Sequence, residues 1–222
     1  MCGIVGFVGK QECSGILLEG LRKLEYRGYD SAGLAVYDGK RTNLLRVEGK
    51  LAGLAKALQE KPLSGSLGIG HTRWATHGRP SEENAHPHKA GPVVVVHNGI
   101  IENHTALRRE LLQSGVVFNS ETDTEIISHL VNREIAAGAN LEGAVRATLR
   151  RIEGSYAIAV SSETEPDKII AARFASPLVI GLGAGENFIA SDIPAILAHT
   201  RDVLFLEDGE MAVVTGDGVR IS

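Results

Sequence analysis

A cysteine occupies the second position of the chain, directly after the initiator methionine. If Met1 is removed, the thiol of Cys2 and a free α-amino group belong to the same residue. An α-amine has a pKa of about 7.7 to 8.0 in reference peptides, so it can accept the thiol proton at neutral pH without a separate histidine. A retained methionine would remove this base. Because free cysteine is often buried, position alone favours a packing role for Cys2.

An amide side chain and a glycine follow the apolar segment around Val95 and Val96, at Asn98 and Gly99. The asparagine side-chain N–H and the glycine N–H can both donate to one oxygen, which is the arrangement of an oxyanion hole. Glycine also lets a substrate approach the backbone closely. A turn that ends a strand explains the same dipeptide, and this alternative stays open.

Polar and aromatic side chains are crowded in the segment HTRWATHG, residues 71–78. The planar guanidinium of Arg73 suits a substrate carboxylate, although a structural ion pair is an equal alternative. Trp74 fits a core position as well as a gate. Asp123, in the first turn of a predicted helix, either interacts with the helix dipole or binds a substrate ammonium. An arginine and an aspartate together would hold both charged ends of an amino acid.

Three histidines, His86, His88 and His97, raise the possibility of a metal site. Their acidic neighbours Glu82 and Glu83 show no established ligand spacing, so we expect no metal. Nucleotide-binding glycine motifs that open a helix are also missing, and we expect no cofactor. The residues by themselves assign no role to His86 and His88.

Patterns of β-branched residues bounded by glycine, aspartate or proline predict a strand-rich chain. The predicted strands are Gly3–Val8, Leu34–Tyr37, Leu44–Val47, Leu67–Gly70, Val93–His97, Tyr156–Ser161, Lys168–Ala172, Leu178–Leu182, Phe188–Ala190, Val203–Leu206 and Met211–Thr215. Turns are expected at residues 208–209 and 216–218.

Four helices are predicted from apolar spacing and capping residues. The first contains Ile16 to Leu24, the second runs from about Asn103 through Leu111, and the fourth covers Leu141 to Ile152. The third begins at Thr122, with Glu125 completing a capping box. Because helices fall between groups of strands, the pattern favours a layered α+β domain over a doubly wound parallel sheet.

Size and charge limit the classes of partner. The chain has 222 residues, a formal net charge of -4 and a pI near 6.1, which excludes a basic surface for nucleic acid or anionic membrane. Apolar runs are far shorter than the roughly 20 residues of a membrane span, and the N-terminus lacks the features of a secretion signal. We therefore expect a cytoplasmic protein. Cys13, the only other cysteine, is assigned to packing.

The first residues, MCGIVG, resemble the start of the class II glutamine amidotransferases. The resemblance narrows to the glucosamine-6-phosphate synthases through the segments YRGYDSAG (26–33), HTRWATHG (71–78), NAHPH (84–88), HNGIIEN (97–103) and SETDTE (120–125). It covers nearly the whole chain. It implies an N-terminal nucleophile hydrolase fold, which is a four-layer αββα sandwich of two antiparallel sheets, without a cofactor or metal.

The same resemblance implies a role for each matching residue. Cys2 would attack the side-chain amide of glutamine, while Asn98 and Gly99 hold the oxyanion. Arg73 would bind the α-carboxylate of glutamine and Asp123 its α-ammonium group.

Further roles follow for residues around this pocket. Thr76 and His77 would line it on a closing loop, and Trp74 resembles the gate to an ammonia passage in the family. Arg27 would brace the region of the nucleophile.

We expect residues 1–222 to form one glutaminase domain. The sugar isomerase half of the family, which binds fructose 6-phosphate, is absent after Ser222. This chain alone is therefore expected to hydrolyse glutamine to glutamate and ammonia. One alternative is the amidase module of another glutamine-dependent transferase, of the phosphoribosyl-pyrophosphate amidotransferase type. A non-catalytic module that binds glutamine is the second.

Overall fold

The computed structural model describes residues 2–222, and the question of whether Met1 is removed lies outside these residues. A seven-stranded sheet has the order β11-β9-β10-β1-β4-β2-β3. Its strands are β1 (Gly3–Val8), β2 (Ser31–Tyr37), β3 (Thr42–Glu48), β4 (Leu67–Arg73), β9 (Val179–Leu182), β10 (Asn187–Ala190) and β11 (Val203–Phe205). Every pairing between neighbouring strands of this sheet is antiparallel.

A six-stranded antiparallel sheet has the order β13-β12-β8-β7-β6-β5. Its strands are β5 (His88–Ala90), β6 (Val93–Ile101), β7 (Gly154–Ser162), β8 (Lys168–Phe174), β12 (Met211–Thr215) and β13 (Val219–Ile221). The helices are α1 (Cys13–Arg22), α2 (Leu51–Glu60), α3 (His104–Gln113), α4 (Thr124–Ala136) and α5 (Leu141–Leu149), with short 3-10 turns η1 (Glu25–Arg27) and η2 (Ile193–Ala195).

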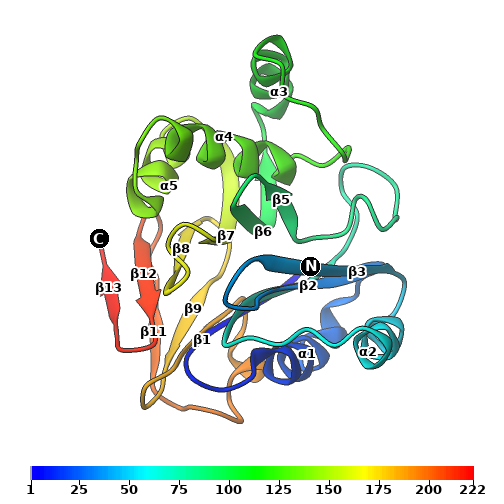
Figure 1. Cartoon of the computed structure of the whole chain (residues 1–222), viewed down its shortest axis with the longest axis vertical. Coiled ribbons are helices and arrows are strands. Elements are labelled where there is room, and N and C mark those ends of the chain that lie inside the picture. The colour runs from blue at the N-terminus through cyan, green and yellow to red at the C-terminus, as the bar shows by residue number, and fades with distance from the viewer. Residues whose placement is uncertain (1) are drawn as a thin grey trace.

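Three apolar cores separate four layers. One core joins α1 and α2 to the seven-stranded sheet, and a second joins α4 and α5 to the six-stranded sheet. The third lies between the two sheets and contains residues such as Ile4, Ile69 and Val96. Figure 1 shows α1 and α2 on the opposite side of the molecule from α4 and α5. The predicted αββα sandwich of two antiparallel sheets is confirmed.

Several predicted elements need correction. Helix α2 was not predicted, although Leu51 and Leu54 are buried on one face of it with helical spacing. Strands β5 and β13, of three residues each, were also missed. No helix within residues 2–222 is long and apolar enough to reach across a bilayer.

The predicted capping box at the start of α4 is only half correct. The hydroxyl of Thr122 accepts a hydrogen bond from the backbone N–H of Glu125 at 3.4 Å, but the helix begins at Thr124. The carboxylate of Glu125 does not return to Thr122. It accepts the N–H groups of Asn119 and Ser120 at 2.8 and 2.7 Å, because these donors lie beside it in the preceding loop.

Leu21 tests the core beneath the seven-stranded sheet. It is fully buried, so Leu21→Ala is expected to lower the free energy of unfolding by about 2–5 kcal/mol through lost contacts and a cavity. Leu112→Ala is the matched control, because this helical leucine is 53% exposed and its loss should matter by no more than about 0.5 kcal/mol. Urea unfolding followed by circular dichroism measures both. Equal effects would contradict the assignment of Leu21 to the core.

Four histidines, His71, His86, His88 and His97, are buried near the edge of the inter-sheet core. Burial lowers the pKa of every one of them below its ordinary value, to about 3 for His71. Three of the rings pack on one another. His86 stacks on His71 with 4.2 Å between ring centroids and meets His88 edge-on at 4.8 Å. The folded chain therefore holds these imidazoles neutral at physiological pH.

This burial predicts a loss of stability in mild acid. Below about pH 6.5 the unfolded chain binds protons on these histidines while the folded chain does not, so the free energy of unfolding should fall as pH decreases. The slope near pH 5 is expected to reach about 1.4 kcal/mol per pH unit for each histidine whose pKa in the folded chain is far below 5, as for His71 and His88 at about 3. Urea unfolding at a series of pH values checks this. An unfolding free energy that stays constant from pH 7 to pH 5 would contradict it.

Candidate active site

The site lies where the inter-sheet core becomes polar. Alternate side chains of β1, β4 and β6 face the space between the sheets, as Ile4, Ile69 and Val96 show. Two residues further along the chain direction that leads out of this core, the same three faces carry Cys2, His71 and Asn98. The pairing of Ile4 with His71 in adjacent strands brings the segments together. The fold thus gathers residues that are about a hundred positions apart in the sequence.

Cys2 lies just before β1 with its sulfur beside the backbone of Trp74. The N–H of Trp74 donates to Sγ at 3.2 Å, and the thiol is 3.6 Å from the carbonyl oxygen of the same residue. Burial raises the pKa of the Cys2 thiol above its ordinary value, while the Trp74 N–H and the charge of Arg73 act in the opposite direction. The net rise means that the thiol needs a base to become a nucleophile at neutral pH.

Asn98 and Gly99 stand within β6, so the alternative of a strand-ending turn is wrong. They pair with Ala157 and Tyr156 of β7. The amide Nδ2 of Asn98 donates to the carbonyl oxygen of Cys2 at 3.1 Å. Gly99 has φ of 132°, and a Cβ there would lie 2.1 Å from the carbonyl oxygen of Ser155. Only glycine fits this position, beside the nucleophile and in contact with the cavity.

Arg73 ends β4 and holds the loop that follows. Its Nη2 donates to the carbonyl oxygens of His77 and Gly78, at 3.2 Å for Gly78. Its Nη1 is buried and has no hydrogen-bond partner among residues 2–222. The guanidinium therefore braces loop carbonyls and keeps one donor for a ligand, rather than serving an ion pair with a neighbouring carboxylate.

Asp123 occupies the N-cap position of α4, yet its side chain does not cap the helix. Oδ2 accepts the backbone N–H of Ile101 at 2.9 Å, and the hydroxyl of Thr124 is 3.5 Å from Oδ1. The side chain lies at the wall of the cavity. Asp123 therefore stands at the start of α4, where its charge also interacts favourably with the helix dipole, and its buried carboxylate lies at the wall of the cavity that Cys2 lines.

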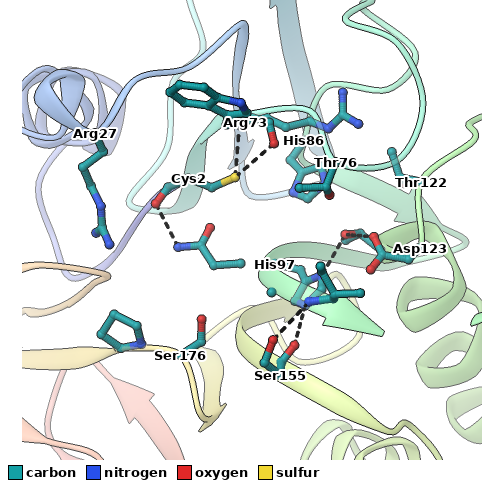
Figure 2. A pocket seen from close by; sticks show the side chains of 16 residues that line it. Cys2, Arg27, Arg73, Thr76, His86, His97, Thr122, Asp123, Ser155 and Ser176 are labelled. Atoms are coloured by element: carbon teal, nitrogen blue, oxygen red, sulfur yellow. Dashed lines mark hydrogen bonds between the residues drawn. The ribbon is translucent and has the colours of Figure 1, made fainter. Parts of the chain in front are cut away.

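A cavity of about 410 Å³ connects these groups, a size typical of small-molecule sites. It is lined by Cys2, Arg27, Arg73, Trp74, Thr76, Asn98, Gly99 and Asp123 among the predicted site residues. His77 does not line it, because its ring packs edge-on against His104 with centroids 4.9 Å apart. Figure 2 shows Cys2 and Asp123 on either side of this pocket, with Ser155 and Ser176 below them in the view.

Trp74 is not a core residue. Its side chain is 55% exposed and lies against Gly28, where a Cβ would come within 2.2 Å of the indole ring. Gly28 also has φ of 77°, so backbone conformation and close approach both require glycine. The exposed indole therefore packs on Gly28 at the lining of the cavity that also holds Cys2.

Arg27 stabilises the beginning of β1 through hydrogen bonds to Ser191. Its Nη1 donates to the carbonyl oxygen and the hydroxyl oxygen of Ser191 at 3.2 and 2.9 Å. The same hydroxyl oxygen accepts the backbone N–H of Ile4 at 3.0 Å. These contacts connect Arg27 to the strand that presents Cys2.

Several lining residues have no counterpart in the sequence predictions. They are Ile100, Thr122, Thr124, Ser155, Ser176 and Pro177. Ser176 and Pro177 come from the loop after β8, far from every motif, so no sequence signal points to them. The histidines His86 and His97 also reach the cavity wall. No group of three or more potential metal ligands within the described chain is arranged to hold an ion.

Comparison with known proteins places this arrangement in a family. Residues 71–198, more than half of the chain, match the family model of the glutamine amidotransferase domain. The chain is 56% identical over 223 residues to glutamine–fructose-6-phosphate aminotransferase (isomerizing) of Escherichia coli strain K12, covering all of this chain and 36% of that protein. The namesake from Clostridium acetobutylicum is 53% identical over 221 residues, with 99% of this chain and 36% of that protein covered.

The fold has solved counterparts. The glutamine phosphoribosylpyrophosphate amidotransferase of B. subtilis superposes on all of this chain and 49% of its own, with a TM-score of 0.87 and 27% identity. The expected N-terminal nucleophile fold is thereby confirmed. The chain spans about a third of the length of the curated relatives that it matches. It belongs to the glutamine amidotransferase domain family.

Proposed function

We propose that this chain hydrolyses glutamine to glutamate and ammonia, with Cys2 as the nucleophile. One observation carries the proposal. The Cys2 thiol, the Asn98–Gly99 pair, the free donor of Arg73 and the Asp123 carboxylate all line a single cavity. A non-catalytic module that only binds glutamine would leave the gathering of the thiol and the amide donor at one cavity without a purpose.

The first half of the reaction forms a thioester. After loss of Met1, the α-amine of Cys2 takes the thiol proton, and Sγ bonds to the side-chain carbonyl carbon of glutamine. The amide Nδ2 of Asn98 and the N–H of Gly99 donate to the resulting oxyanion. The α-ammonium then protonates the amide nitrogen, and the carbon–nitrogen bond breaks to release ammonia.

Water completes the reaction. The α-amine of Cys2 accepts a proton as water adds to the thioester carbonyl, and the same two donors hold the second oxyanion. The carbon–sulfur bond then breaks, glutamate leaves, and the thiol regains its proton. Because burial raises the pKa of the Cys2 thiol, the sulfur leaves in its protonated form. The same protonated thiol is the resting state between turnovers.

Two charged side chains select the substrate. Arg73 binds the α-carboxylate through Nη1, and Asp123 binds the α-ammonium group. Thr76 and His77 belong to the loop whose carbonyl oxygens accept hydrogen bonds from Arg73. The position of this loop and the binding of the α-carboxylate therefore depend on the same guanidinium group. A buried pocket that pairs both ends of glutamine leaves charges unpaired when either end is missing.

The activity of the whole protein extends the proposal. The curated relatives are named for transfer to fructose 6-phosphate, and we infer that residues 1–222 form the glutaminase domain that supplies ammonia to a sugar isomerase domain. Trp74 would act as the gate of the ammonia passage, because its exposed side chain lines the cavity that holds the Cys2 thiol. An amidase module of the phosphoribosyl-pyrophosphate type is the second candidate. The chain is only 27% identical to that solved enzyme, whereas it is 56% identical to the fructose-6-phosphate aminotransferase of E. coli. We further propose a cytoplasmic location.

Labelling of the thiol tests the nucleophile. We expect a glutamine analogue with an electrophilic ketone to add once, at Cys2, in a chain that lacks Met1, as measured by intact mass and peptide mapping. Cys2→Ala should abolish both the adduct and glutamate release while glutamine still binds, because Arg73 and Asp123 remain. Cys13→Ala is the matched control, since burial raises the pKa of that thiol to about 12 and labelling should persist. A processed, folded chain with neither adduct nor glutamate would overturn the function.

Asp123 carries the prediction for substrate recognition. Asp123→Asn is expected to raise KM for glutamine by about 10- to 100-fold, the equivalent of a hydrogen bond to a charged group. Glu121→Gln is the control, because it removes the same charge from an exposed side chain two residues away. The variant should also lose the preference for glutamine over its analogue without an α-amino group. Full preservation of that preference would contradict the assignment of Asp123.

A further inference from the structure

The orientation of the Asn98 side chain depends on a residue outside the proposed chemistry. For an oxyanion hole, the amide must direct its Nδ2 toward Cys2 and its Oδ1 away. The two ends of an amide have nearly the same shape, so packing alone does not distinguish them. Hydrogen-bond partners of fixed character must do so.

His71 is the partner of the oxygen end. Its Nε2 lies 2.9 Å from Oδ1 of Asn98 and 3.0 Å from the backbone carbonyl oxygen of His97. A carbonyl oxygen can only accept, so Nε2 must carry the proton. The atom of Asn98 that faces this N–H must then be an acceptor, which is Oδ1.

The nitrogen end is determined independently. Nδ2 of Asn98 is 3.1 Å from the carbonyl oxygen of Cys2, which also only accepts. Both ends of the amide are therefore consistent with one orientation. When the amide donor turns to an oxyanion during the reaction, the contact with Cys2 is given up and His71 remains the fixed reference.

His71 is suited to a constant role. It is fully buried and stacks on His86, which holds the plane of the ring. Burial lowers its pKa to about 3, and Nδ1 has no hydrogen-bond partner within residues 2–222. The imidazole consequently stays in the neutral Nε2–H form over the whole working range of pH.

We propose that His71 is a positioning residue that holds the carboxamide of Asn98 with its donor toward the reacting carbonyl. The inference rests on the proposed function, because it assigns His71 a role in that same reaction. His71 acts only through Asn98 and touches neither the thiol nor the substrate.

Two amide replacements separate this role from simple packing. In His71→Gln the side-chain N–H₂ reaches the place of Nε2, whereas in His71→Asn it reaches only that of Nδ1. We expect His71→Gln to retain kcat within about 5-fold. His71→Asn should lower kcat by about 10- to 100-fold, which is less than the decrease in kcat expected when an oxyanion donor is removed outright. The KM for glutamine should change by less than about 3-fold. Equal kcat values for the two variants would overturn the proposal.

A double-mutant comparison identifies the route of the effect. In an Asn98→Ala background, His71→Asn should cost less than about 2-fold in kcat, since the residue that it positions is gone. A loss of the same size in both backgrounds would show that His71 acts by another route. If Asn98→Ala itself leaves kcat unchanged, the proposed oxyanion hole fails instead.

A spectroscopic measurement decides the matter if a variant does not fold. Long-range ¹H–¹⁵N correlation spectra of the unaltered chain report which ring nitrogen of His71 carries the proton. We expect the Nε2–H form, unchanged from pH 5 to pH 8. A proton on Nδ1, or a titration within this range, would overturn the proposal without any assay of activity.

Discussion

The site depends on the double pairing of β1. Chain termini are usually poorly ordered unless a sheet holds them, and here the first strand is bonded to β4 on one side and β10 on the other. All six residues of the strand are buried. Cys2 directly precedes Gly3, the first paired residue, so the ladder fixes the backbone next to the thiol. The path from Arg27 through Ser191 to Ile4 adds a side-chain brace at the same end.

The polar edge of the inter-sheet core carries little charge of its own. Its four histidines are neutral because burial makes protonation unfavourable. Among the residues that line the cavity, charge is carried by Arg27, Arg73 and Asp123, the last two at the positions proposed for the two ends of an amino acid. A buried imidazolium nearby would repel a substrate ammonium group, since charges interact strongly where water is excluded. Neutral imidazoles instead supply hydrogen bonds that orient amides and hydroxyls, as His97 does with Thr124 at 2.9 Å.

The sequence predicted the residues that belong to dense local motifs and missed those that the fold alone brings in. Cys2, Arg73, Asn98 and Asp123 stand in recognisable segments, and all line the cavity. Ser176 lies in a loop without any motif, and only the course of the chain after β8 brings it to the site. The layered fold was predictable because strand alternation is a local property.

Other errors arose where local sequence permits two structures. The Asn98–Gly99 dipeptide is typical of a turn, yet pairing with β7 keeps it in a strand, a choice made by residues more than fifty positions away. The same limit applies to the capping box, because the carboxylate of Glu125 had N–H donors of the preceding loop available that helix spacing does not reveal. Tertiary pairing decided both cases against the local preference.

The site holds hydrogen-bonding capacity that the protein itself does not use. Nη1 of Arg73 is buried without a partner among residues 2–222, and an unmet donor of this kind is unfavourable by about 1–3 kcal/mol. Asp123 accepts one backbone N–H and has further lone pairs directed at the cavity. A ligand with a carboxylate and an ammonium group satisfies both at once. Because Nη2 of Arg73 holds the loop carbonyls, a carboxylate bound at Nη1 would also stabilise the arginine that orders the loop.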